Sequence, residues 1–319
     1  MRTQEGGNVD VVAVRGNFDD AQSAVKRLFA DDDLREKLAA RNIRLSSANS
    51  INWGRLLPQI IYYVYASEKL FKKFGEPFDF VVPTGNFGNI LAGYFAKRMG
   101  SPIRKLFCAS NENDVLTDFF RNGIYDRKRE LVKTASPSMD ILVSSNLERL
   151  LYLETKDASM VAGWMRELQE KGSYAVPEEL SDRFRKVFDC GEAYDDEDAF
   201  DAIRTCYERY GYVMDTHTAV GYAAFSEAFW PEEPDGPVVY VSTASPFKFA
   251  PSVVYALTGE SLEGKEAVDR LEELSKTAAP ASLRDLFRKP VRFSDAVGPE
   301  NITGSIKERL LKQAERASE

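Results

Sequence analysis

The sequence predicts an α/β fold built on a mostly parallel, doubly wound sheet. Residues 78–82 form an apolar run of buried-strand length, and an amphipathic helix follows from Ile90 to about Gly100. A second strand is expected at 103–109, and it leads into a polar turn and a helix from Val115. Strands joined by such a crossover helix are parallel, and their ligands bind beyond the carboxyl ends of the strands. We therefore expect a site in the turns that follow these two strands.

The composition is that of a globular protein and argues against several partners. The 319 residues are 44% hydrophobic and 29% charged, which suffices for one large core or two ordinary ones. A net charge of -8 argues against nucleic acid and anionic membranes. We expect no signal peptide and no membrane span, because no apolar run is long enough. Three cysteines are too few for a disulfide framework, so we expect a reducing cytoplasm. Because the cysteines lack paired spacing and His217 is the single histidine, we expect no metal site.

The turn after the first strand is rich in glycine and asparagine. It contains the candidate ligand residues Gly85, Asn86, Phe87, Gly88 and Asn89, directly before a helix. Glycines let the backbone approach a ligand closely, and the first N–H groups of a helix have no internal partners, so the turn predicts an anion cradle. The spacing is neither that of the nucleotide P-loop nor G-x-G-x-x-G, which disfavours a nucleotide. On spacing alone, a simple chain reversal explains the turn as well as a bound phosphate does.

The run VPTGNFGN followed by ILAGYFAKRMG resembles the cofactor-phosphate loop of threonine synthases, which are pyridoxal-phosphate enzymes. The segments SSANSINWGR, CASNENDVLTDFF and STASPFKF are similar to other segments of that family. The resemblance implies a tryptophan-synthase-β-like (type II) fold and pyridoxal 5'-phosphate as cofactor. It also implies that the backbone and asparagines of residues 85–89 hold the cofactor phosphate.

A polar stretch precedes the apolar helix expected over residues 56–65. Its hydroxyls and amides need partners if they are buried, and a helix N-cap made by Ser50 or Asn52 is one explanation. The family resemblance implies a second, that the stretch lines the substrate side of the cofactor. The candidate substrate ligands are then Ser47, Asn49, Asn52 and Arg55, with the planar Arg55 guanidinium facing the substrate's phosphate. A helix-surface salt bridge is the alternative for Arg55.

A hydroxyl pair follows the strand expected over residues 238–241. A hydroxyl at the end of a buried strand can meet a pyridine nitrogen without imposing the charge of a carboxylate. The resemblance of STASPFKF to the family implies this role, for which Thr243 is the first choice and Ser242 the second.

Near the start of the chain, Gly16-Asn17-Phe18 follows a strand expected over residues 9–14 and echoes the later turn. We expect this first turn to be structural, because Asp19 and Asp20 would repel a phosphate at that helix N-terminus. We also expect His217, at the start of a helix, to be structural rather than catalytic.

No catalytic residue is assigned, because the family's Schiff-base lysine lies in a Phe-Lys-Asp segment that this sequence does not contain. Lys72, Lys156 and Lys248 stand in other contexts. We therefore expect a threonine synthase chain that lacks its N-terminal portion. The expected organisation is a remnant of a smaller α/β domain at 1–45, a main cofactor-binding domain at 46–260 with a helical insertion at about 152–198, and a C-terminal helical segment at 261–319.

The resemblance implies a carbon–oxygen lyase that converts O-phospho-L-homoserine and water to L-threonine and phosphate. Without the lysine we expect weak or no activity from this chain alone. Two alternatives stay open: a non-catalytic binder of pyridoxal phosphate or another small phosphate, and a subunit completed by a separate N-terminal chain. The oligomeric state is left open.

Overall fold

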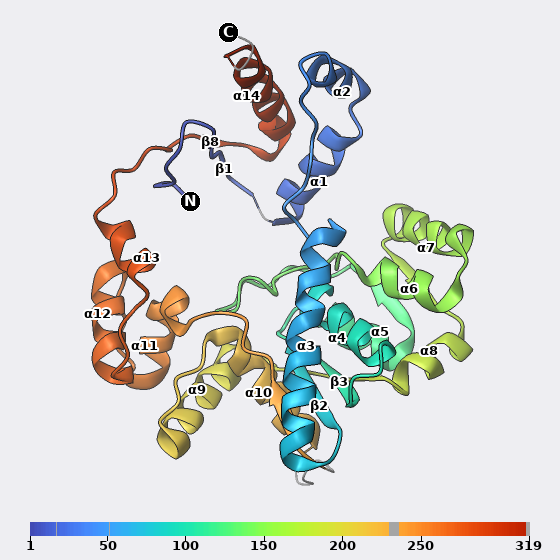
Figure 1. Ribbon diagram of the computed structural model, residues 1–319, viewed down its shortest axis with the longest axis vertical. Helices are drawn as coiled ribbons and strands as arrows, with labels where there is room; N and C mark the ends of the chain where they lie inside the picture. Colours follow the sequence, from blue (N-terminus) through green and yellow to red (C-terminus); the bar gives the residue numbers. More distant parts are fainter. Residues whose placement is uncertain (17, 51, 230–235, 317–319) are drawn as a thin grey trace. The chain divides into compact units, whose positions relative to one another are not determined.

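The computed structural model describes residues 1–16, 18–50, 52–229 and 236–316. The chain divides into two compact units (Figure 1). Unit 1 combines Met1–Ser47 with Ala281–Glu319, and unit 2 is Ala48–Pro280. The expected domain limits near residues 45 and 260 stay a prediction, and the compact units divide at 47/48 and 280/281.

Unit 2 is organised around a four-stranded parallel sheet with the strand order β6-β3-β2-β7. Its strands are β2 (Phe78–Pro83), β3 (Ile103–Ser110), β6 (Phe188–Glu192) and β7 (Val238–Tyr240). Pro83 is in register with Ala109, and Ser110 with Glu192, so the carboxyl ends of β2, β3 and β6 lie side by side. This sheet confirms the α/β class and the parallel arrangement predicted for β2 and β3.

Helices cover both faces of this sheet (Figure 1). On one face, Val81 and Phe107 pack against Phe225 of α10 (Thr216–Phe229). On the other, Phe80 and Leu106 belong to a larger core cluster. That cluster includes residues of α3 (Trp53–Phe74), α4 (Gly88–Arg98) and α5 (Val115–Asn122). Alternate strand residues therefore point to opposite layers, as a doubly wound sheet requires.

The segment expected to be a helical insertion at about 152–198 is not all helical. It contains β6, which pairs with β3 at the edge of the main sheet. An edge strand pairs on one side only, and the polar residues of Phe188–Glu192 hide its strand pattern within a charged stretch. The other elements of unit 2 are β4 (Ile124–Asp126), α6 (Leu147–Thr155), α7 (Ala158–Lys171), β5 (Ser173–Ala175), α8 (Glu178–Arg185), α9 (Asp196–Tyr210), η1 (Pro246–Phe249), α11 (Ala250–Thr258) and α12 (Gly264–Ser275).

Unit 1 has its own small core, formed by Leu28, Leu34, Leu38 and Ala314. These residues come from α1 (Phe18–Phe29), α2 (Asp32–Ala39) and α14 (Ile302–Arg316). The strand expected over residues 9–14 is reduced to β1 (Ala13–Val14), which pairs in parallel with β8 (Ala296–Val297). The remaining elements are α13 (Ala281–Arg284), η2 (Asp285–Phe287) and η3 (Pro299–Asn301).

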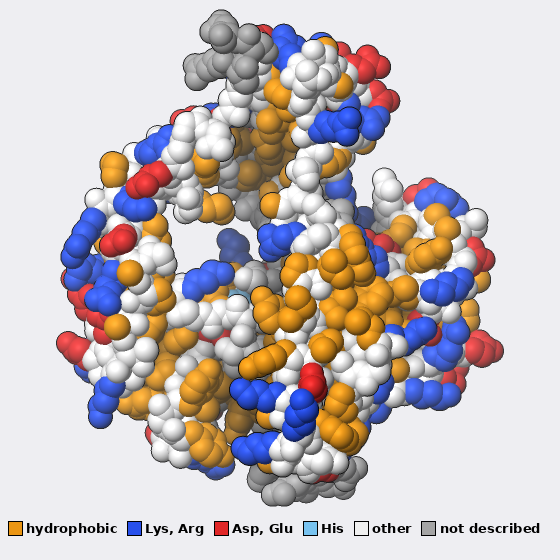
Figure 2. All heavy atoms as spheres, viewed as in Figure 1, with side chains coloured by type: hydrophobic (Ala, Val, Ile, Leu, Met, Phe, Trp, Pro, Cys, Tyr) orange, Lys and Arg blue, Asp and Glu red, His pale blue; other side chains and the backbone are white. Residues whose placement is uncertain are grey.

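The outer face of α3 is unusually apolar. Leu57, Ile61, Tyr62 and Tyr65 are each more than half exposed, and Figure 2 shows apolar side chains gathered over this helix. Despite this character, no helix in the described ranges is long and apolar enough to cross a membrane.

Candidate functional site

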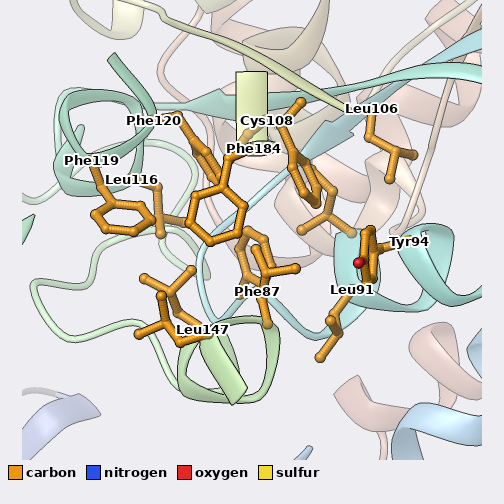
Figure 3. Packing of buried hydrophobic residues seen from close by; sticks show 14 of the residues in the cluster. Phe87, Leu91, Tyr94, Leu106, Cys108, Leu116, Phe119, Phe120, Leu147 and Phe184 are labelled. Carbon is orange, nitrogen blue, oxygen red and sulfur yellow. The ribbon is translucent and has the colours of Figure 1, made fainter. Parts of the chain in front are cut away.

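The turn between β2 and α4 is shaped by a close backbone approach and a buried aromatic ring. A Cβ atom on Gly85 would lie only 2.7 Å from the carbonyl oxygen of Ser138, so only glycine fits there. Phe87 has a left-handed backbone, with φ of 53°. Its ring is buried in the core and stacks on Phe120 at a centroid distance of 5.8 Å (Figure 3). Phe87 can therefore contribute its backbone N–H to a ligand, while its side chain anchors the turn.

The N-terminus of α4 offers unused hydrogen-bond donors. Among the described residues, none of the backbone N–H groups of residues 86–90 donates to a protein acceptor. The N-cap residue Phe87 supplies no side-chain cap, and the first turn of the helix contains no acidic residue. An uncapped helix start without a carboxylate attracts an anion through its free N–H groups and the positive end of the helix dipole. The turn therefore fits a phosphate group.

The segment 144–146 binds this turn through side-chain hydrogen bonds. The Ser144 hydroxyl donates to the carbonyl oxygen of Gly85 at 2.7 Å, and the Ser145 hydroxyl donates to Asn86 Oδ1 at 2.9 Å. Asn146 Nδ2 donates to the carbonyl oxygen of Asn86 at 2.8 Å. Sequence reasoning missed these three residues. They stand in a polar segment, and nothing local in the sequence shows that they contact a turn about 60 residues earlier.

Asn89 is held by a buried phenol. The hydroxyl of Tyr63, on α3, donates to Asn89 Oδ1. Burial raises the pKa of Tyr63 far above its ordinary range, so the phenol stays neutral and remains a donor.

The polar stretch before α3 serves partly as a helix cap. The side chain of Asn52 accepts from the N–H of Gly54 at 2.9 Å, which confirms the capping alternative for Asn52. Arg55 is exposed, and its Nη1 donates to the carbonyl oxygen of Ala48 at 2.6 Å. Ser50, which sequence reasoning considered only as a cap, accepts from Asn146 Nδ2 at 3.1 Å. The structure thus brings Ser50 to the β2–α4 turn.

The other candidate substrate ligands are not tested by these contacts. Ser47 is the last residue of unit 1, whereas Asn49 lies in unit 2 and accepts from the Ser50 hydroxyl at 3.2 Å. The assignment of Ser47, Asn49, Asn52 and Arg55 to substrate stays a prediction.

The hydroxyl pair after β7 lies at the same edge of the sheet as the β2–α4 turn. Tyr240 is in register with Val81, and the N–H of Val241 donates to the carbonyl oxygen of Val81. Thr243 is exposed, so its hydroxyl is open to a ligand. The Ser242 hydroxyl lies 3.1 Å from Thr218 Oγ1 and 3.5 Å from Asp215 Oδ2. Ser242 is exposed as well, so exposure does not separate the first choice for a ring-nitrogen partner, Thr243, from the second.

Asp215 is a fully buried carboxylate beneath this pair. Burial by itself raises its pKa, but hydrogen bonds from His217 and Thr218 outweigh burial and lower the pKa below the ordinary 3.8. The carboxylate is therefore ionised at neutral pH and organises the network around it.

His217 links two segments through its ring. Its Nδ1 lies 3.2 Å from Asp215 Oδ1, and its Nε2 accepts from the N–H of Ser138 at 3.2 Å. Both ring nitrogens are thus engaged, and the ring holds the Ser138 backbone that covers Gly85. These contacts support the structural interpretation of His217.

The polar turn after β3 faces the loop at 132–140. Asn111 Nδ2 lies within 3 Å of side-chain oxygens of Thr134, Ser136 and Asp140. Asp114 is the N-cap residue of α5, but its side chain makes no capping hydrogen bond. The turn fixes the loop whose later residues cover Gly85. Within the described ranges, no group of three His, Cys, Asp or Glu residues could hold a metal.

Taken together, the free N–H groups of residues 86–90 and the absence of an acidic residue in the first turn of α4 fit the phosphate group of a pyridoxal cofactor. Comparison with known families gives the class. The family described as "Pyridoxal-phosphate dependent enzyme" matches residues 2–244. The chain therefore belongs to the pyridoxal-phosphate dependent enzymes.

Within that class, the chain falls among the threonine synthases. The family described as "Threonine synthase, C-terminal" matches residues 218–303. The threonine synthase of Eremothecium gossypii is 39% identical over 98% of this chain, and that of Saccharomyces cerevisiae is 37% identical over 98%. A human protein named "Threonine synthase-like 1" is 44% identical over 77% of this chain and 34% of its own length.

Solved structures confirm the type II fold. The pyridoxal-phosphate-bound threonine synthase of Brucella melitensis superposes with a TM-score of 0.79 at 34% identity, covering 98% of this chain and 61% of that one. The yeast enzyme superposes with a TM-score of 0.77 at 35% identity, covering 98% and 62%. This chain spans 61% of the length of the Eremothecium and Saccharomyces relatives.

Proposed function

We propose that this chain carries the cofactor-binding core of a threonine synthase, the enzyme that converts O-phospho-L-homoserine and water to L-threonine and phosphate. The observation that supports this proposal most strongly is the uncapped start of α4. Its free N–H groups at residues 86–90 lie beyond the carboxyl end of β2, where α/β sheets bind ligands.

Each proposed ligand has a distinct task. The backbone N–H groups of Asn86, Phe87, Gly88 and Asn89 hold the cofactor phosphate, and Gly85 allows the chain to pass beneath Ser138. The Thr243 hydroxyl meets the ring nitrogen. Pyridoxal phosphate supplies an electron sink that makes protons on the substrate carbons removable.

The exposed guanidinium of Arg55 is the proposed partner of the substrate phosphate, since its fork suits that anion. Ser47, Asn49 and Asn52 are proposed to line the substrate side with it.

No lysine of this chain is assigned to proton transfer. The sequence contains no Phe-Lys-Asp segment. Lys248 is exposed and lies over the ring of Phe249, and Lys72 pairs with Glu68 on the surface of α3. Positioning groups without the covalent anchor and its base leave little turnover, so we expect weak or no threonine formation from this polypeptide alone.

A second candidate is a non-catalytic binder of pyridoxal phosphate or another small phosphate. It is favoured by the contrast between a phosphate turn built wholly from this chain and the missing lysine. A third candidate is a subunit that a separate chain completes. The exposed apolar side chains of Leu57, Ile61 and Tyr65 on α3 favour it. The three free cysteines are compatible with the proposed cytoplasmic location.

Two measurements on the purified chain separate these candidates. Pyridoxine 5'-phosphate has no aldehyde, so calorimetric titration with it measures the phosphate and ring sites without any lysine. We expect saturable binding that inorganic phosphate competes away. Phosphate release from O-phospho-L-homoserine with added pyridoxal phosphate is expected to be near background, and a rate typical of an enzyme, about 1 per second or more, would contradict the expectation of weak activity.

A further inference from the structure

Two consecutive carbonyl groups of the β2–α4 turn accept hydrogen bonds from the segment 144–146. Gly85 O accepts from the Ser144 hydroxyl at 2.7 Å, and Asn86 O accepts from Asn146 Nδ2 at 2.8 Å. The carbonyl groups of the turn are thus fixed on the side of residues 144–146.

A peptide unit is planar and trans, so its N–H points away from its own C=O. Binding Gly85 O and Asn86 O from the 144–146 side therefore turns the N–H groups of Asn86 and Phe87 to the opposite side. Phe87 is left-handed, with φ of 53° and ψ of 2°, and Gly88 then begins α4. Successive N–H groups in such a turn converge into a concave anion-binding nest.

Asn146 is costly at its position. It is 1% exposed, it has a φ of 75°, and within the described part of the chain its Oδ1 has no hydrogen-bond partner. A left-handed non-glycine backbone and an unpaired buried acceptor both lower the stability of a fold. Asn146 is the N-cap of α6, yet its side chain does not cap that helix. Its amide instead bridges Asn86 O and, at 3.1 Å, the hydroxyl of Ser50.

We propose that Asn146, assisted by Ser144, is a positioning residue that fixes the peptide planes of residues 85–87 so that their N–H groups face a phosphate. This inference rests on the proposed phosphate-binding function of the turn. It explains why position 146 is an asparagine although glycine would adopt this left-handed backbone with less strain. Glycine has no side-chain amide to donate to both Asn86 O and the Ser50 hydroxyl.

The Asn146→Gly variant separates positioning from stability. It relieves the left-handed backbone and removes the unpaired Oδ1, so we expect an unchanged or higher unfolding midpoint. It also removes the donor to Asn86 O, and we expect affinity for pyridoxine 5'-phosphate to fall about tenfold. A matched control is Lys156→Gly at the other end of α6. Lys156 is also left-handed, with φ of 56°, but it is exposed, so its variant is expected to bind like the unmodified protein.

A second variant and a second measurement test the same positioning role independently. Ser144→Ala removes the donor to Gly85 O, and we expect a weakening of about fivefold from the loss of one hydrogen bond. Amide hydrogen exchange of residues 86–90 is expected to slow on adding pyridoxine 5'-phosphate in the unmodified chain, and to slow much less in Asn146→Gly.

The outcomes distinguish this inference from the proposed function. If the unmodified chain does not bind pyridoxine 5'-phosphate, the proposed function is wrong and the inference fails with it. If the unmodified chain binds and Asn146→Gly and Ser144→Ala bind equally well, the proposed function stands and the positioning role is overturned.

Discussion

The tripeptide Gly-Asn-Phe occurs twice between a strand and a helix, at residues 16–18 and 85–87, and the residues after it differ. In unit 1, the Asp20 carboxylate lies so close to Gly16 that a Cβ on that glycine would collide with it. In unit 2, the tripeptide is followed by Gly88 and Asn89, and the first turn of α4 contains no acid. The same tripeptide is thus combined with a carboxylate in one unit and with free N–H groups in the other.

The comparison teaches that a glycine-rich turn is not sufficient for an anion site. The charge in the first helical turn and the partners of the turn carbonyls decide whether the N–H groups are available. The first turn was expected to be structural because of its two aspartates, and the position of Asp20 supports that interpretation.

The largest effect is expected from Gly85→Ala. Its Cβ would meet Ser138 O at 2.7 Å and Met139 Cα at 3.2 Å, and both are backbone atoms that cannot move cheaply. We expect a loss of about 1–3 kcal/mol in the free energy of unfolding and at least a tenfold loss of pyridoxine 5'-phosphate affinity. Gly16→Ala is the matched control, because its Cβ meets only side-chain atoms of Asp20 and Pro299. If Gly85→Ala and Gly16→Ala bind pyridoxine 5'-phosphate equally well, the proposed difference between the two turns is wrong.

Gly88→Asp would give the second turn the charge of the first. A Cβ on Gly88 fits, since its nearest neighbour is Ser50 Cβ at 3.4 Å. Repulsion between a carboxylate and a bound phosphate at a helix start is worth about 1–2 kcal/mol, so we expect affinity to fall about 5- to 30-fold. Gly88→Asn has the same shape without the charge and should retain most of the affinity. If Asn and Asp weaken binding equally, charge is not what separates the two turns.

Asp215→Asn tests the network in which Asp215 holds His217, whose ring binds the Ser138 backbone next to Gly85. The pKa of Asp215 is lowered by hydrogen bonds from His217 and Thr218, in spite of burial, so the ionised carboxylate stabilises the fold above the ordinary pKa of 3.8. That stabilisation is lost as the pH falls below 3.8 through the folded-state pKa. We expect the variant to lose about 1–3 kcal/mol at pH 7 and to show a weaker fall in stability between pH 5 and pH 3. Parallel urea titrations across this range measure both effects.

The smallest effect is expected from Thr243→Ala. It removes a proposed hydrogen bond to the ring nitrogen, so affinity for pyridoxine 5'-phosphate should fall about threefold to tenfold. Binding of inorganic phosphate, which has no ring, should not change. Ser242→Ala is the comparison variant, and a larger loss with Ser242→Ala would transfer the ring role to Ser242.

The sequence predicts the centre of unit 2 better than its surroundings. The patterns that predict β2, β3 and the glycine-rich turn after β2 are local signals, and all three are confirmed as elements of the fold. β6 was missed because an edge strand with polar residues resembles the charged segment around it. Ser144 and Asn146 were missed because their partners lie about 60 residues earlier, and no local pattern reports such a contact. The ring of Phe87 could not be placed for the same reason, since its stacking partner Phe120 belongs to another helix.

The most direct test of the central claim is an absorption spectrum of the purified chain with a small excess of pyridoxal phosphate. The sample is then treated with borohydride and its peptides are mapped, with and without competing inorganic phosphate. We predict cofactor binding that phosphate competes away and no lysine modified in stoichiometric amount, because this chain provides the phosphate turn without the anchoring lysine. A single lysine trapped stoichiometrically would contradict the claim, and so would the absence of any phosphate-sensitive binding.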